Sequence, residues 1–220
     1  MCTVTEQILW PGVADFHLAG PGKGVLVCRV GSGQATYHRF DPANGQHQIT
    51  YGARMIQAKH QPETASGWLS AREIQQRSYF RGRLSALNLL SHTCCHEFAH
   101  LLQHDAGQRY RGSVHNRHFY RILDELHASG QAEASRRALS DLAREQGLTL
   151  ADERFDIPEP SNNREAWRVG DEVLFHTGRH QVRGEVLRVN RKTCTISGIG
   201  NFKGIRYRVP VQLLKQVGVQ

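Results

Sequence analysis

Five consecutive residues have the types and the spacing of a metal-dependent hydrolase site. His96, Glu97 and His100 fit the pattern H-E-x-x-H, with Phe98 and Ala99 between them. Four residues advance a helix by about 400°, so both imidazoles project from one face of a helix, one turn apart, where they can bind the same metal ion. A carboxylate beside the first ligand can take a proton from water bound to that metal. The pattern therefore predicts a zinc site with Glu97 as its general base.

Other histidines nearby offer alternative pairs of ligands. His92, His96, His100 and His104 recur at four-residue spacing, so three neighbouring pairs face the same side of the predicted helix. Only the pair His96 and His100 has a carboxylate directly after its first histidine, because the other two pairs have a threonine or a leucine in that place. We therefore interpret His92 and His104 as solvated residues or as residues that support the ligands.

Two histidines leave a catalytic zinc site incomplete, because such sites take three protein ligands and keep a fourth position for water. A third histidine six residues after the second, as in one large protease class, is excluded because Ala106 stands there. Glu125 on a later helix is conceivable as the third ligand. The better candidate is His115, which follows a short loop and opens a second amphipathic helix. His118, three residues further on, stays an alternative.

The chain resembles a known family in the two motifs H-E-F-A-H and H-N-R-H-F. These motifs are similar to those of the SprT-like zinc metalloproteases, the Spartan and WLM-related proteins, whose H-E-x-x-H is followed by H-G-x-x-F/W at the start of the next helix. The resemblance covers roughly residues 47–128. It implies that His115 is the third ligand, that Glu97 is the general base and that Phe119 packs the second helix. Asn116 stands where the family has a glycine.

The resemblance implies a zinc-dependent endopeptidase that cuts a protein substrate. Three neutral imidazoles leave the zinc its charge, so Glu97 can take a proton from water as it attacks a peptide carbonyl and then deliver that proton to the leaving amine. The oxyanion that forms needs a further donor. Tyr110, Arg111 and Tyr120 are available near the motifs, and the sequence does not choose among them. Family members that process DNA–protein crosslinks make proteins bound to nucleic acid the expected substrates.

Regular apolar spacing predicts the helices that must hold these residues. Apolar residues at three- and four-residue intervals predict a helix from residue 84 to a stop at Gly107, and a second helix over 115–128. Ser70 and Glu73 have the spacing of a capping box that opens a helix near residue 71. A further helix is predicted over 131–146. The resemblance implies that these helices form a zincin-like helical core around the H-E-x-x-H motif.

Three β-prone runs precede the helices, at residues 25–30, 35–40 and 48–51. Glycine-containing turns between them predict a small antiparallel N-terminal sheet. The fold class is therefore expected to be α+β, with the sheet beside the helix of the metal site. An extended substrate could add to an edge of that sheet as a further strand.

The pattern changes after a short segment that is punctuated by prolines. Residues 157–164 indicate a linker between a metalloprotease domain at 1–156 and a second domain at 165–220. The second domain has four or five short β-prone runs separated by glycines and turn residues. The phrase V-G-D-E-V at its start resembles SH3-like and KOW-like modules. We expect a small all-β SH3-like barrel.

Charge separates the two predicted domains. From Arg164 onward there are 11 lysines and arginines against 4 acidic residues, which accounts for +7 of the chain's net charge of +8. A compact basic module suits the phosphate backbone of DNA or RNA, with little sequence preference. The alternative is a basic barrel that braces the protease or binds another protein. The candidate nucleic-acid contacts are basic residues of the predicted strands and turns: Arg183, Arg188, Arg191, Lys192, Arg206 and Arg208.

Composition limits the remaining possibilities. No stretch approaches 18 apolar residues, and residues 1–6 show no basic region followed by an apolar run, so neither membrane insertion nor secretion is predicted. Five cysteines without a spaced framework favour a reducing, cytoplasmic compartment. Two other functions stay open. One is a zinc hydrolase or protease without nucleic-acid dependence, and the other is a nucleic-acid-binding protein whose zinc is structural.

Overall fold

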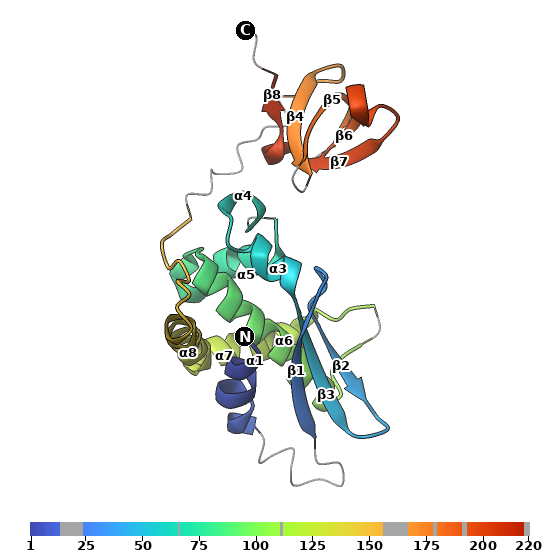
Figure 1. Ribbon diagram of the computed structural model, residues 1–220. Helices are drawn as coiled ribbons and strands as arrows, with labels where there is room; N and C mark the ends of the chain where they lie inside the picture. Colours follow the sequence, from blue (N-terminus) through green and yellow to red (C-terminus); the bar gives the residue numbers. More distant parts are fainter. Residues whose placement is uncertain are drawn as a thin grey trace. The chain divides into compact units, whose positions relative to one another are not determined.

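The chain forms two compact units, Met1–Ile157 and Pro158–Gln220. The first unit mixes helices with a small sheet, and the second consists mainly of β-strands (Figure 1). The predicted linker at 157–164 lies outside the described residues. No helix in the described part of the chain is long and apolar enough to cross a membrane. A computed structural model describes residues 1–13, 24–65, 67–110, 112–155, 167–177, 180–190 and 193–217.

Three strands of the first unit form one sheet: β1 (Val25–Gly31), β2 (Tyr37–Asp41) and β3 (Gln46–Gly52). β3 is the central strand and is mostly buried, whereas β2 lies at one edge. β2 and β3 form the predicted antiparallel hairpin. The turn between them places Gly45 at a φ of 64°, a backbone conformation that favours glycine.

The predicted antiparallel arrangement is wrong for the first strand. β1 pairs with β3 in parallel, with Gly31 opposite Gly52. The connection from β1 to β2 is not a hairpin, because it crosses the end of β3, where the Arg54 N–H donates to the Gly33 carbonyl at 3.1 Å. A Cβ at Gly52 would lie 2.5 Å from that same oxygen. Glycine at this position therefore permits the crossing, and the sheet is mixed.

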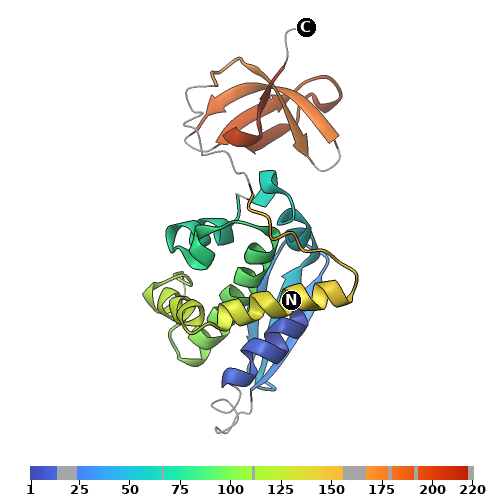
Figure 2. The ribbon, with the colours of Figure 1, turned by 90° about the vertical axis from the view of Figure 1, so that its left-hand side faces the viewer.

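Helices make up the remaining regular structure of the first unit. The last three coincide with the predicted helices to within two residues. The N-terminal helical segment lies beside the last helix (Figure 2). In chain order the helical segments are α1 (Cys2–Val4), η1 (Thr5–Leu9), α3 (Ala53–Ala58), α4 (Pro62–Ala65), α5 (Leu69–Gln76), η2 (Tyr79–Gly82), α6 (Ala86–Asp105), α7 (Arg117–Ala128) and α8 (Gln131–Glu145).

Helix α6 is the central element of the first unit. It contacts β2 and β3 of the sheet and also α5, α7 and α8 (Figure 1). The Ser85 hydroxyl caps it by accepting from the Asn88 N–H at 3.1 Å, a cap that contributes about 1 kcal/mol. Leu89, Phe98 and Leu101 are fully buried, and each contributes about 1.5–3 kcal/mol by leaving water. Packing on several sides fixes the direction in which each α6 side chain projects.

The second unit is a five-stranded antiparallel sheet with strand order β7-β6-β5-β4-β8. Alternate residues point inward, so Cys194 and Ile196 are buried while their neighbours are half-buried. This alternation is the two-residue period of a strand with one buried face. The elements are β4 (Glu172–Thr177), β5 (His180–Val189), β6 (Thr193–Gly198), η3 (Gly200–Phe202), β7 (Arg206–Pro210), η4 (Val211–Leu213) and β8 (Lys215–Gln216).

The sheet of the second unit does not close into the predicted barrel within the residues described. β7 and β8 remain its two edges. Gly184 lies inside β5, although glycines were expected to separate the strands. A Cβ at this position would be 2.4 Å from Ile196 Cγ2 on the neighbouring strand, so the close approach of the two strands requires glycine. The pairing of β5 with β6 shifts between Val186 and Arg188. Such a bulge bends a strand and increases its local twist.

Candidate metal centre

Helix α6 carries both histidines of the H-E-x-x-H motif in its second half. The ring centroids of His96 and His100 lie 4.9 Å apart, as expected for residues one helical turn apart. His100 is buried, with 6% of its surface exposed, and His96 is half-buried. The helix therefore holds two imidazoles on one face in a largely dry environment.

His115 approaches the same point from the loop before α7. Asn116 caps that helix, because its Oδ1 accepts from the backbone N–H groups of His118 at 2.9 Å and Phe119 at 3.1 Å. Gln103 of α6 donates to the same oxygen at 3.1 Å. Asn116 has a φ of −87°, which any residue can adopt. Asn116 thus ties the loop to α6.

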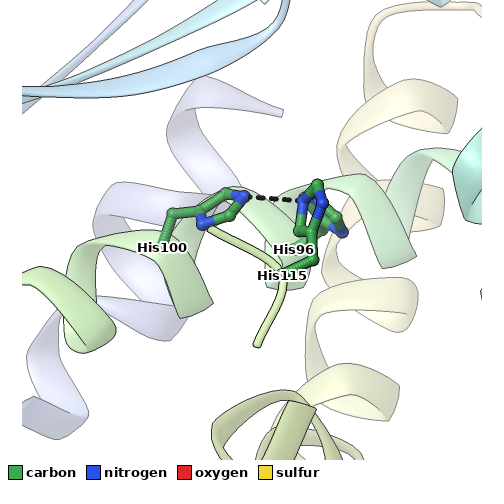
Figure 3. A group of neighbouring side chains, drawn as sticks. All are labelled: His96, His100 and His115. Carbon is green, nitrogen blue, oxygen red and sulfur yellow. Dashed lines mark hydrogen bonds between the residues drawn. The ribbon is translucent and has the colours of Figure 1, made fainter. Parts of the chain in front are cut away.

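The three imidazoles point toward one another (Figure 3). Nε2 of His115 lies 3.1 Å from Nε2 of His96 and 3.1 Å from Nε2 of His100. Two nitrogens bound to one tetrahedral zinc ion are about 3.3 Å apart, so both distances from His115 differ from that geometry by only about 0.2 Å. Imidazole nitrogen is also a preferred zinc ligand. The three histidines, which we call the histidine triad, could therefore hold a metal ion.

Phe119 forms the apolar base of the triad. Its side chain is fully buried. The centroid of its ring lies 4.9 Å from that of His96, 4.4 Å from that of His100 and 4.9 Å from that of His115. One aromatic side chain therefore packs against all three rings and restricts their rotation, which reduces the entropy that they lose on binding an ion.

Two of the triad histidines, His100 and His115, are neutral at pH 7. Burial, together with His96 and His115, lowers the pKa of His100 to about 2. Burial and His96 also lower the pKa of His115. A neutral imidazole keeps a lone pair for a metal ion, whereas a protonated one does not. Both residues can therefore accept a cation without first releasing a proton.

Glu97 lies beside the triad and is 5% exposed. Burial raises the pKa of its carboxyl group, although the nearby charges of His96, Lys59 and Arg109 act to lower it. Its Oε2 has no hydrogen-bond partner among the described residues. A buried carboxyl group with an unused oxygen is expensive for the fold and is typical of a proton-transfer site.

A pocket of about 270 Å³ opens over the triad and Glu97, and two cations line it that the sequence patterns did not indicate. Lys59 is 3% exposed, donates to Thr93 Oγ1 and lies 5.6 Å from the centroid of the Trp68 ring. Burial lowers its pKa to about 8. The second cation is Arg109, from the loop that follows α6. Both side chains place positive charge around the metal-binding residues.

Two histidines of the sheet, His38 and His47, support Arg109. Its Nη1 donates to His38 Nδ1 at 3.1 Å. His38 Nε2 lies 3.0 Å from His47 Nδ1, and the two rings are stacked. Burial and the neighbouring His47 lower the pKa of His38 to about 3, so its ring is uncharged and accepts from the guanidinium. Strand β2 therefore supplies the support that directs Arg109 toward the pocket.

The donors that the sequence suggested for the oxyanion do not line this pocket among the described residues. Tyr110 is 52% exposed. Tyr120 instead lies under Arg77, whose guanidinium carbon is 4.1 Å from its ring centroid, at a different pocket. Arg111 lies outside the described residues. The cationic side chains that do line the pocket are those of Arg109 and Lys59.

Glu73 was predicted to cap a helix, and this prediction is wrong. Helix α5 begins after Trp68 without a side-chain cap, so Ser70 and Glu73 do not form a capping box. The carboxylate points inward, and its Oε2 lies 2.9 Å from His92 Nε2 and 2.9 Å from His96 Nδ1. His92 is completely buried and is therefore not a solvated residue. It supports a ligand through Glu73.

The other histidine and glutamate candidates lie away from the triad. His104 packs against Phe40, with ring centroids 4.7 Å apart. His118 is half-buried in the first turn of α7 and belongs to no metal-binding group in the described part of the chain. Glu125 pairs with Arg121 at 2.7 Å on the exposed side of α7.

Four of the predicted nucleic-acid contacts are exposed on the sheet of the second unit: Arg183, Arg188, Arg206 and Arg208. Arg188 and Arg208 stand on either side of Thr195, one from each neighbouring strand. Residues in register share a face, so these two arginines flank the threonine, with their backbones about 10 Å apart. Arg208 Nε also donates to Thr193 Oγ1 at 3.2 Å. This row of residues, Arg188, Thr195 and Arg208, is called the arginine row.

The remaining predicted contacts do not extend the arginine row. Arg183 pairs with Glu172, with Nε 2.9 Å from the carboxylate Oε2, so its charge is compensated. Arg191 and Lys192 lie outside the described residues. The exposed positive charge of the described sheet is therefore concentrated on β5 and β7.

No protein-family model, curated protein or solved structure matched this chain.

Proposed function

We propose that this protein is a zinc-dependent endopeptidase of the SprT-like type, which is recruited to nucleic acid and cleaves proteins bound there. The observation that carries the proposal is the convergence of His96, His100 and His115, with the buried carboxyl group of Glu97 beside them. The mixed α+β architecture of the first unit agrees with a zincin-like core, in which the helix of the H-E-x-x-H motif lies against a sheet.

The ligand set supports a catalytic zinc ion over a structural one. Structural zinc sites are closed by four protein ligands, whereas catalytic sites use three and keep one position open. The triad has three ligands, and no fourth histidine, cysteine or carboxylate of the described residues joins it. A structural ion also has no need of a buried carboxyl group such as Glu97. Both observations weigh against a nucleic-acid-binding protein whose zinc only stabilises the fold.

The residues around the triad have complementary roles in peptide hydrolysis. Bound zinc supplies a Lewis acid that polarises a peptide carbonyl and lowers the pKa of water. Glu97 takes the proton of the attacking water on its unpartnered Oε2 and delivers it to the leaving amine. The raised pKa of Glu97 moves it toward the operating pH, where a group both accepts and releases protons efficiently.

The edge strand β2 is the proposed binding surface for an extended substrate. β2 has a paired neighbour on one side only within the described sheet. Thr36 and Tyr37, at its start, line the same pocket as the histidine triad. A peptide that pairs with the free edge of β2 therefore runs past the triad, with main-chain hydrogen bonds that do not depend on its sequence.

Arg109 is proposed to stabilise the oxyanion of the tetrahedral intermediate. Arg109→Met should lower kcat by about 10²–10³-fold with a smaller change in KM, because an oxyanion donor acts mainly in the transition state. Steady-state kinetics on a fluorogenic peptide would measure both constants. Arg117→Met, at an exposed position of α7, is the control and should leave them unchanged. A rise in KM alone would instead make Arg109 a substrate-binding residue.

The second unit is proposed to be an SH3-like module that binds the phosphate backbone of DNA or RNA. The arginine row and Arg206 place exposed cations on the sheet of the second unit. The sequence from Arg164 onward accounts for most of the chain's net charge. Guanidiniums bind phosphate through paired N–H groups. Contacts of this kind favour affinity without sequence preference.

Removing the arginine row should weaken DNA binding and its dependence on salt. Each phosphate contact contributes about 0.9 to the slope of log K against log salt concentration, so Arg188→Gln with Arg208→Gln should lower that slope by about 2. Fluorescence anisotropy of labelled DNA with the full chain, at several salt concentrations, gives the slope. Arg183→Gln is the control, because its charge is already paired with Glu172. An unchanged slope in the double variant would contradict the assignment.

Cleavage of a DNA-binding protein with and without DNA tests the proposed function as a whole. The zinc-loaded protein should cleave a basic DNA-binding protein faster when both are bound to DNA, and a chelator should stop the reaction. The variant that lacks the arginine row should lose the acceleration but keep the DNA-independent rate. Equal rates with and without DNA would favour a zinc protease without nucleic-acid dependence.

A further inference from the structure

A buried chain of hydrogen-bonding side chains extends from His96 into the core of the first unit. Glu73 of α5 joins His92 and His96 of α6, with 2.9 Å between its Oε2 and each ring nitrogen. His92 Nδ1 lies 3.0 Å from Nε2 of His127 on α7. Three helices therefore each contribute to one chain, His127–His92–Glu73–His96, which ends at a histidine of the triad.

These hydrogen-bonded side chains are buried away from water, where polar and charged groups are energetically unfavourable. His92 is 0% exposed and Glu73 is 3% exposed. Burying a carboxylate is unfavourable unless it is paired and hydrogen-bonded. The ion pairs of Glu73 in the described part of the chain are those to His92 and His96 only. His92 and His96 both present a ring nitrogen to the same oxygen, Oε2, which is how two donors bind a carboxylate.

A strained turn packs against His127, at the end of the hydrogen-bonded series that is furthest from the triad. Ser78, Phe80 and Arg81 all have positive φ, at 57°, 47° and 58°. This backbone conformation is unfavourable for residues with a side chain, and it persists where surrounding contacts require it, most often at functional sites. The turn places Tyr79 flat against His127, with centroids 3.7 Å apart and an angle of 4° between the rings. The strain thus serves to fix His127.

The directions of these hydrogen bonds follow from the acceptor at their centre. A carboxylate only accepts, so His96 carries its proton on Nδ1 and His92 carries its proton on Nε2. His92 Nδ1 then has a free lone pair, which accepts from Nε2–H of His127. With the proton on Nδ1, the lone pair of His96 Nε2 is left on the side of the ring that faces Nε2 of His115.

We propose that Glu73, oriented by His92 and His127, is the positioning residue of the metal site, which fixes the tautomer of His96 and adds negative charge behind it. A carboxylate that accepts from a ligating histidine raises the basicity of that ligand and locks its orientation. The negative charge of Glu73 also becomes compensated when a divalent cation binds to His96. The inference rests on metal binding by the triad, which is part of the proposed function, but not on cleavage.

The same atoms could in principle form a second metal site, because Glu73, His92 and His96 also lie within ligand distance of one another. Such a site would require His96 Nδ1 to lose the proton that it donates to Glu73. His96 would then bridge two cations buried side by side. The positioning role predicts one zinc ion per chain, whereas a second site predicts two.

Zinc affinity of the full chain tests the proposal without a measurement of cleavage. Glu73→Gln keeps an oxygen that can accept but removes the charge, and it should weaken zinc binding by about 10–100-fold in a titration against a competing chelator. Glu73→Ala removes both and should weaken it further. His127→Phe keeps a ring against Tyr79 and should show a smaller loss in the same direction. Glu125→Gln, an exposed carboxylate on α7, should bind zinc as the natural sequence does.

Imidazole nitrogen NMR of the unaltered, zinc-loaded protein tests the same proposal if a variant does not fold. His96 should carry a proton on Nδ1 and bind zinc through Nε2, with one zinc per chain. Ligation through Nδ1, two zinc ions per chain, or unchanged affinity in Glu73→Gln would overturn the positioning role alone. Failure of the unaltered protein to bind zinc would overturn the proposed function, and this inference with it.

Discussion

Glu97→Gln should lower kcat for peptide cleavage by about 10²–10⁴-fold, the contribution expected of a general acid–base group. Zinc content should stay at that of the unaltered protein, because Glu97 is beside the triad and not one of its three histidines. The amide keeps the size of the side chain in its buried site but cannot take a proton. Single-turnover cleavage with zinc analysis of the same sample would measure both quantities.

The control for Glu97→Gln is the same substitution at an exposed carboxylate. Glu145→Gln lies at the end of α8 and should change neither cleavage nor zinc content. Retained cleavage in Glu97→Gln would contradict the role of Glu97 as general base. Loss of zinc in that variant would instead indicate that the carboxylate helps to hold the ion.

His115→Ala should remove zinc and cleavage together, with a loss of affinity larger than the about 10–100-fold expected for a supporting residue. Two histidines on one helix would remain, and the loop before α7 would lose its tie to the metal. His118→Ala should leave zinc binding intact, because His118 does not belong to the triad. Zinc analysis after dialysis, with thermal unfolding to establish that both variants fold, separates these outcomes. The reverse result would reassign the third ligand.

The position of the triad was predictable because its spacing is set by helix geometry. An H-E-x-x-H pattern on α6 determines that His96 and His100 share a face, whatever the rest of the chain does. The placement of His115 could not be predicted from helix geometry alone, because it depends on a cap that ties the loop to α6. Asn116 is a good helix-capping residue, and this local preference agrees with the tertiary contact that Gln103 makes to it.

Residues that act through tertiary contacts could not be predicted in the same way. Glu73 has the spacing of a capping box, and only the approach of α6 directs its carboxylate inward. Lys59 and Arg109 follow no periodic pattern, yet they line the pocket because the turns that carry them end beside it. Local sequence contains no signal for such contacts, which depend on how distant segments pack.

The sheets show the same division between local and non-local information. The hairpin of β2 and β3 follows from the turn at Gly45, which is local. The parallel pairing of β1 with β3 depends on a connection that crosses the end of β3. The glycine-containing turn after β1 had instead predicted an antiparallel hairpin. In the second unit, the ion pair of Arg183 with Glu172 lies across two strands, so register had to be known before the free arginines could be identified.

The central claim is that the histidine triad and Glu97 form a zinc-dependent peptidase site. Stepwise addition of zinc to the metal-free protein, with the rate of cleavage of an unfolded protein substrate measured at each step, tests it most directly. The rate should rise in proportion to added zinc and reach its limit at one equivalent per chain, and Glu97→Gln should bind the same equivalent without cleaving. Cleavage that is independent of zinc, or zinc binding by the unaltered protein without any cleavage, would contradict the claim.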